Sequence, residues 1–136
     1  MSHPLQAMMV KLNWQLNELN LHLHEAQRQI QAVEQQIEEI DQHMNQTGLK
    51  SLLINPEFEI NRLNFITQQQ EMKIELITVL KDHHDVEAKL NDKILRVKTE
   101  LKMLEKYLDR EALSQKEQQK KVQDNAMDEW VIQRRE

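Results

Sequence analysis

Apolar residues recur along residues 5–44 in steps of four and three, without interruption. They are Leu5, Met9, Leu12, Leu16, Leu19, Leu23, Ala26, Ile30, Val33, Ile37, Ile40 and Met44. An average step of 3.5 residues is the repeat at which a helix keeps one narrow apolar stripe, here called the seam, against a partner helix. The residues between are mostly Gln, Asn, Glu and His. The pattern therefore predicts a coiled-coil helix that needs a second helix to cover it.

The turn signals of the chain lie within residues 45–57. Gly48 is the only glycine, and Pro56 disfavours a helical conformation for the residue before it. We therefore expect a bend within 45–57, between a first helix over about 5–46 and a second over about 57–132. The midpoint between Leu5 and Leu108, the outermost strong seam residues, falls at Pro56. The expected fold is all-α: a long antiparallel two-helix coiled-coil hairpin, forming a single domain over residues 1–136.

The seam of the second helix is less regular. Its first half is traced through Leu63, Ile66, Ile77 and Leu80, and its second half from Leu90 to Leu108. A polar gap over residues 82–85 separates the halves, which are out of phase in this trace. We therefore expect a local overwinding of the coiled coil there.

A second apolar stripe runs beside that seam. Phe58, Phe65, Met72 and Val79 recur every seven residues, with Leu76 next to them. One interpretation is that the first helix packs in a broad groove between the two stripes. The other is that one stripe docks a further protein, together with Leu52, Leu53 and Ile54, because exposed aromatic residues on a thin rod are costly unless they are used.

The C-terminal residues 109–136 extend past the matched seams and contain few apolar residues before the last turns. Met127, Trp130, Val131 and Ile132 then cluster among charges of both signs. This segment is either a polar helix that frays at its end or a docking element for a partner.

Composition and charge exclude several classes of function. The chain has 30% charged and 4% aromatic residues, no cysteine and a net charge of −5. We do not expect a nucleic-acid-binding surface, because the basic pairs at 120–121 and 134–135 are diluted by acids. No signal segment and no apolar run long enough for a bilayer is evident, so we expect a soluble cytoplasmic protein that does not insert into the membrane.

Catalysis and metal binding are not expected either. His22 and His24 fall on different sides of a helix, and His83 and His84 are adjacent, whereas helical zinc ligands are spaced three or four residues apart. The sequence has no glycine-rich phosphate loop, and a two-helix rod lacks the concave pocket that catalysis requires. We therefore predict a protein that is not an enzyme and binds no cofactor or metal.

Several motifs resemble one family. They are Leu5, Met8 and Lys11 near the start, residues 25–30 and 104–111 in the two helices, and Gln118, Lys121, Asp128, Glu129, Arg134 and Arg135 at the end. Together with the predicted hairpin, these resemble the FliJ/YscO-like central-stalk proteins of flagellar export and type III secretion.

The resemblance implies a non-catalytic stalk that stands in the centre of a hexameric secretion ATPase and couples it to the export gate. The family's termini insert into the ring, which implies ring contacts at the motif residues near the two ends and at Trp130. The family's hairpin end contacts the cytoplasmic domain of the large export-gate protein and export chaperones. This implies gate or chaperone contacts at Leu52, Leu53, Phe58, Phe65 and Met72, and a location peripheral to the membrane-embedded apparatus.

Two other functions are compatible with the same pattern. One is a structural coiled-coil tether or self-associating scaffold whose seam is completed by a second copy. The other is a chaperone-like hairpin that clasps client proteins. The sequence does not distinguish a flagellar from an injectisome system.

Overall fold

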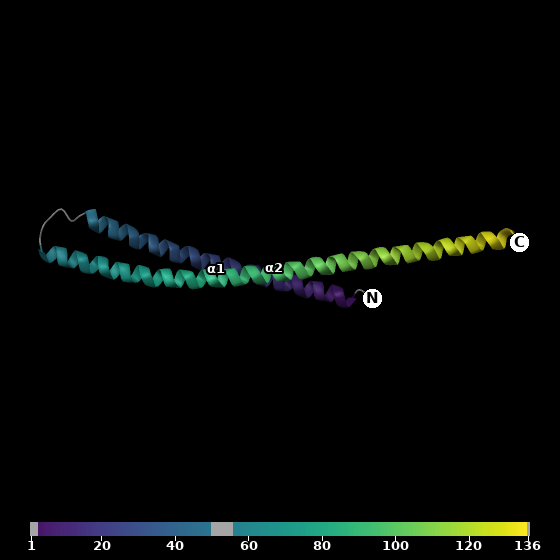
Figure 1. Ribbon diagram of the computed structural model, residues 1–136, viewed down its shortest axis with the longest axis horizontal. Helices are drawn as coiled ribbons and strands as arrows, with labels where there is room; N and C mark the ends of the chain where they lie inside the picture. The colour runs from purple at the N-terminus through teal and green to yellow at the C-terminus, as the bar shows by residue number, and fades with distance from the viewer. Residues whose placement is uncertain (1–2, 50–55, 136) are drawn as a thin grey trace. The chain divides into compact units, whose positions relative to one another are not determined.

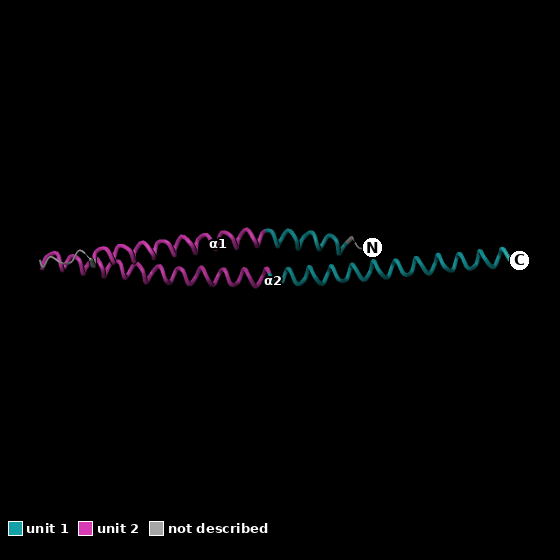
Figure 2. The backbone as a smooth tube through the Cα atoms, turned by 90° about the horizontal axis from the view of Figure 1, so that it is seen from above, with its two compact units in different colours: residues 1–17, 95–136 teal, residues 18–94 magenta. Residues whose placement is uncertain are grey.

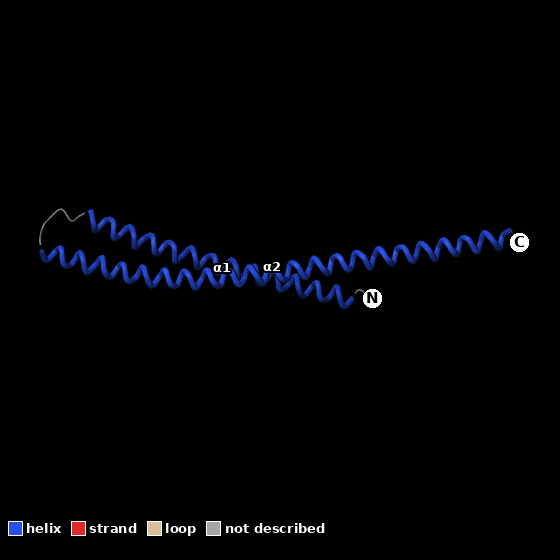
Figure 3. The backbone as a smooth tube through the Cα atoms, viewed as in Figure 1, coloured by secondary structure: helices blue, strands red, loops and turns tan. Residues whose placement is uncertain are grey.

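The computed structural model describes residues 3–49 and 56–135, and every one of them is helical (Figure 1, Figure 3). Helix α1 comprises His3–Leu49, 47 residues, and helix α2 comprises Pro56–Arg135, 80 residues. The two helices pack antiparallel, so the prediction of an all-α two-helix hairpin is confirmed. Both helices extend slightly beyond their expected bounds, and Ile54, like the rest of residues 50–55, lies outside the described residues.

The ends of the helices follow local rules of the backbone. Pro56 is the first residue of α2, where its missing N–H costs no hydrogen bond. Glu57 and Glu59 lie in the first turn of α2, and Arg134 and Arg135 lie in its last turn. These charges complement the helix dipole at both ends.

The chain divides into two compact units, which Figure 2 shows in different colours. Unit 1 comprises Met1–Asn17 and Leu95–Glu136, and unit 2 comprises Glu18–Ile94. Each unit contains a length of α1 and a length of α2. In unit 1, Gln6 lines the same surface hollow as Leu108 and Gln115, which places the start of α1 beside this part of α2. In unit 2, Lys73 of α2 donates a hydrogen bond of 2.7 Å to Asp41 of α1.

The seam of α1 is buried as predicted. Every seam residue from Leu5 to Met44 is buried or half-buried, and Ile30 and Ile40 are each only 6% exposed. The alternation continues to Thr47, which is half-buried and donates a hydrogen bond of 2.8 Å from its hydroxyl to the carbonyl of His43. The turn-like residues before Gly48 therefore belong to the helix.

The seam of α2 corrects the prediction for its first half. Half-buried and buried positions step by three and four without a change of phase from Glu59 to Glu111. They are Glu59, Arg62, Ile66, Gln69, Lys73, Leu76, Leu80, His83, Glu87, Leu90, Ile94, Val97, Leu101, Leu104, Leu108 and Glu111. The expected overwinding is therefore wrong. Seam positions between Leu80 and Leu90 are separated by three, four and three residues, and these steps continue the regular repeat.

Two residues assigned to the seam of α2 lie beside it. Leu63 is 50% exposed and Ile77 is 48% exposed. The seam positions beside them are Arg62 and Ile66, and Leu76 and Leu80. Further seam positions of α2 hold Glu59, Lys73 and Glu87, which are half-buried as long polar side chains can be. A trace that accepts only apolar residues misses such positions.

Candidate protein-binding surfaces

The candidate functional features of the described residues are exposed apolar surfaces. No group of three or more potential metal ligands occurs within residues 3–49 and 56–135. Within the same ranges, neither helix has a stretch that is both long and apolar enough to cross a bilayer. His22 lies 3.8 Å from the carboxylate of Glu18, and His84 lies 3.5 Å from that of Glu87, so these histidines pair with acids on their own helix.

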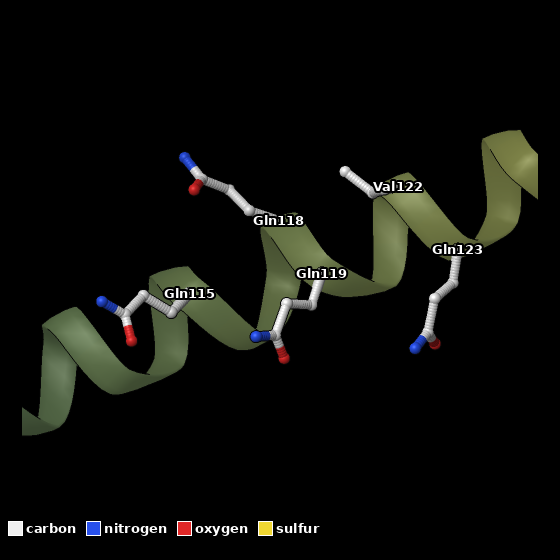
Figure 4. A pocket seen from close by; sticks show the side chains of 5 residues that line it. All are labelled: Gln115, Gln118, Gln119, Val122 and Gln123. Atoms are coloured by element: carbon white, nitrogen blue, oxygen red, sulfur yellow. The ribbon is translucent and has the colours of Figure 1, made fainter.

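The C-terminal part of α2 is the most exposed segment of unit 1. From Ala112 to Arg135 every residue is exposed. The positions that would continue the seam are Gln115, Gln118, Val122, Asn125, Glu129 and Ile132, so the apolar repeat fades there. Figure 4 shows Gln118 and Val122 on one side of the helix and Gln119 and Gln123 on the other. This amide-rich surface gives α1 little apolar area to bury against.

The last turns of α2 carry a different apolar face. Met127, Trp130 and Val131 are 65%, 53% and 42% exposed, and their spacing places them on one side of the helix together with Arg134. The guanidinium carbon of Arg134 lies 4.5 Å from the centroid of the Trp130 ring, which is a cation–π contact. We call these four residues the terminal cluster.

The terminal cluster does not continue the seam of the hairpin. Relative to Leu108, its members lie on average about 90° to 155° around the helix, for 3.6 or 3.5 residues per turn. A longer α1 would therefore not cover the cluster. Its apolar area faces away from the intramolecular partner and is free to contact another molecule.

The predicted ring-contact residues all belong to unit 1, and all of them except Leu5 are exposed. Leu5 is a half-buried seam residue, so its side chain packs in the hairpin. Met8 is 53% exposed, and Lys11 is exposed. The remaining predicted residues are exposed on the C-terminal part of α2: Gln118, Lys121, Asp128, Glu129, Trp130, Arg134 and Arg135.

One exposed apolar pair of unit 1 is missed by the sequence analysis. Val10 and Trp14 are 69% and 63% exposed. Trp14 lies midway between the seam residues Leu12 and Leu16 and so faces away from α2. The spacing of Val10 and Trp14 by four residues, off the seam, is the signal in the sequence that marks them.

Unit 2 carries an apolar column along α2. It consists of Phe58, Phe65, Met72, Val79 and Val86, which are 70%, 37%, 46%, 40% and 48% exposed and lie seven residues apart. Phe65 is the least exposed, because it lines a shallow open groove with His43, Thr47 and Gln69. Val86 extends the predicted stripe by one heptad. Leu76, expected beside the stripe, is instead a half-buried seam residue.

Helix α1 lies between two apolar flanks of α2 in unit 2. The apolar column forms one flank, and Leu63, Ile77, Ile60 and Ile74 form the other. The predicted packing of the first helix between two stripes agrees with this arrangement only in part, because Ile66 and Leu80 of one predicted stripe are themselves seam residues. Both flanks keep roughly half of their area in solvent. Leu52 and Leu53, which are predicted to join the docking surface, lie outside the described residues.

An ion pair borders the start of the apolar column. Arg62 donates hydrogen bonds to both carboxylate oxygens of Glu59, from Nε at 3.1 Å and from Nη2. The hydrogen bond from Arg62 lowers the pKa of Glu59, and the same contact raises the pKa of Arg62. Both residues occupy half-buried seam positions, so the pair keeps two charges satisfied there.

Comparison with known proteins gives no relative from which a role is transferable: no family model, no curated protein and no solved structure matches this chain. The candidate surfaces therefore rest on the geometry of the hairpin and on the residues themselves.

Proposed function

We propose that this protein is a non-catalytic stalk subunit of a type III or flagellar protein-export apparatus. In this role it inserts into the hexameric secretion ATPase and couples the ATPase to the export gate. The observation that carries the proposal is the exposed helical segment from Ala112 to Arg135, which ends in the terminal cluster. A segment in which every residue is exposed has its apolar face available for a ring of surrounding subunits.

The ring end of the proposed stalk is unit 1. Met8, Lys11 and the C-terminal motif residues are exposed there, as a contact with the ATPase requires. Trp130 is the expected anchor, because a half-exposed Trp with Arg134 against its face provides a large contact area and a charge at the same place. Leu5 contributes by holding the start of α1 in the seam.

The gate end of the proposed stalk is unit 2. Phe58, Phe65 and Met72 of the apolar column are the proposed contacts with the cytoplasmic domain of the large export-gate protein or with export chaperones. Their seven-residue spacing suits an amphipathic helix of a partner. In this proposal the protein works in the cytoplasm, at the periphery of the membrane-embedded apparatus, and takes no cofactor.

The direct test measures ATP hydrolysis by the secretion ATPase from the same organism, with and without this chain. We expect the chain to stimulate hydrolysis and to bind the hexamer, and Trp130→Ala to weaken binding by about thirtyfold, as the loss of an anchor residue does. Met103→Ala is the matched control, because Met103 is similarly exposed on the same helix but lies outside the segment from Ala112 to Arg135. Absence of binding by the unmodified chain would refute the stalk.

A further inference from the structure

We infer that two copies of this chain pair through the apolar column, with the two α2 helices antiparallel and Met72 at the two-fold axis. This pairing does not rest on the proposed stalk function, and while two copies are paired it excludes the proposed gate contact at Phe58, Phe65 and Met72. It places Phe65 against Val79 of the other copy, and Phe58 against Val86, because each of these pairs is centred on residue 72. The interface is isologous, as two-fold interfaces between identical chains are.

The spacing of the column requires a helix as its partner. Side chains that repeat every seven residues along a helix form a row that only another helix matches over several turns. From Phe58 to Val86 the column covers about four heptads, which is the length that a coiled-coil contact needs. The covering helix therefore has to present an apolar row of comparable length outside its own seam.

The column of a second copy is such a row. Within residues 3–49 and 56–135, the other exposed apolar residues form shorter or interrupted groups. The opposite flank of α2 is broken by Gln70, which lies between Leu63 and Ile77 at the same seven-residue spacing. Among the described residues, the column alone continues without a polar member, and it is therefore the best match for itself.

Charge permits this contact despite the net charge of −5. The column itself carries no charge. The facing positions of α1 in unit 2 are His22, Gln29, Gln36 and His43, all exposed and none of them an acid. The other flank of α2 lies instead beside the α1 positions that include Glu34 and Asp41. Pairing through the column therefore avoids bringing acids of two copies of α1 together.

The orientation follows from the row of residues on the outer side of the column, which is Asn61, Gln68, Glu75 and Asp82. In a parallel pair, Glu75 would meet Glu75 and Asp82 would meet Asp82, which is unfavourable. In the antiparallel pair centred on Met72, Glu75 of one copy lies nearest to Gln68 of the other copy, and Asp82 lies nearest to Asn61. Glu75 and Asp82 then each have an amide of this row as their nearest neighbour in it.

The experiment measures the mass of the chain in solution by sedimentation equilibrium over a concentration series. We expect a dimer for the unmodified chain, and Met72→Glu to raise its dissociation constant by at least about thirtyfold, because two carboxylates meet at the axis. Ile74→Glu is the matched control, since Ile74 is 64% exposed on the opposite flank, and it should leave the dimer intact. Circular dichroism checks that each variant remains helical.

A charge-swap pair tests the register. Phe65→Lys and Val79→Glu should each weaken the dimer, and the double variant should restore it, because the two substituted positions of opposite charge then face each other across the interface. A monomeric unmodified chain would overturn the inference. Equal loss in Ile74→Glu and Met72→Glu, or no recovery in the double variant, would overturn the proposed contact. All of these measurements use the chain alone, so their failure is separate from that of ATPase stimulation.

Discussion

The ammonium group of Lys73 on α2 lies 2.7 Å from the carboxylate of Asp41 on α1, and this ion pair bridges the two helices of unit 2. The two residues are 32 positions apart in the sequence. The midpoint between them lies one residue from Pro56, which is the midpoint of the hairpin expected from the sequence. Lys73 also occupies a half-buried seam position, where its charge is held beside the apolar seam of α1. The pair therefore marks the register of the helices at a position where an apolar side chain would pack better.

Replacing that lysine should strengthen the hairpin. Lys73→Leu exchanges a half-buried charge for an apolar seam residue and should add about 1 kcal/mol, since exposed or half-exposed ion pairs contribute little. For a chain of this size the gain corresponds to a rise in Tm of roughly 4 °C. Thermal unfolding followed by circular dichroism measures it. Lys81→Leu, at an exposed position, is the control and should leave Tm almost unchanged.

The register in unit 1 is tested by a disulfide between the helices. Leu12 and Leu101 are each 8% exposed, and they are centred on the same midpoint as Leu5 and Leu108. We expect the double variant Leu12→Cys, Leu101→Cys to form an intramolecular bond on oxidation, because the chain has no other cysteine to compete. Non-reducing electrophoresis distinguishes the products, and linkage exclusively between molecules would contradict the hairpin.

Deleting residues 118–136 should separate binding from folding. The last seam residue of α2 is Glu111, and every residue from 112 to 135 is exposed. The shortened chain should therefore keep the Tm of the full chain within a few degrees. If the proposed stalk function holds, its stimulation of the secretion ATPase should be lost. A large fall in Tm would show that the deleted segment packs on the hairpin.

Phe65 should contribute to both stability and binding. A fully buried Phe→Ala change costs about 3–5 kcal/mol, but Phe65 is 37% exposed, so we expect Phe65→Ala to cost roughly 1–2 kcal/mol. Phe58→Ala, at 70% exposure, should stay within about 0.5 kcal/mol. Urea unfolding gives both values. A cost for Phe65→Ala as small as that of Phe58→Ala would mean that the groove with His43 does not hold the ring.

The pH dependence of Glu59 should reveal its pairing with Arg62. The pKa of Glu59 is below its ordinary value of 4.5 in the folded chain, because Arg62 hydrogen-bonds its ionised form. The stabilising contribution is therefore present above pH 4.5 and is lost as the pH falls through the lower folded-state pKa. NMR titration of the Glu59 carboxyl carbon measures this pKa. Arg62→Gln should raise it toward the ordinary value, whereas an unchanged pKa would contradict the pairing.

The sequence predicts the first helix better than the second for a physical reason. Between Leu5 and Met44 each seam position holds an apolar residue, so the repeat is visible in the pattern of apolar residues alone. In α2 the positions of Glu59, Lys73 and Glu87 are fixed by the register of the whole helix pair. Long polar side chains tolerate half-burial there, and hydrophobicity does not reveal them.

The candidate surfaces are predictable to a similar extent. The stripe through Phe58 and Met72 is evident from its seven-residue spacing, and the exposed end of α2 is evident from the end of the seam. The exposure of Trp14 depends on which side of α1 faces its partner, so it follows only once the seam is fixed. The face of the terminal cluster likewise depends on the phase of the helix at Glu111.

Both tryptophans of the chain, Trp14 and Trp130, are in unit 1, and so is the only tyrosine, Tyr107. All three side chains are more than half exposed. The tryptophan and tyrosine fluorescence of the protein therefore originates in unit 1 alone and is sensitive to whatever covers that surface. A partner bound there shifts the emission directly, whereas a partner seated on Phe65 and Met72 touches neither kind of ring. The intrinsic fluorescence of the protein thus reports binding at one of its two candidate binding surfaces, the one in unit 1.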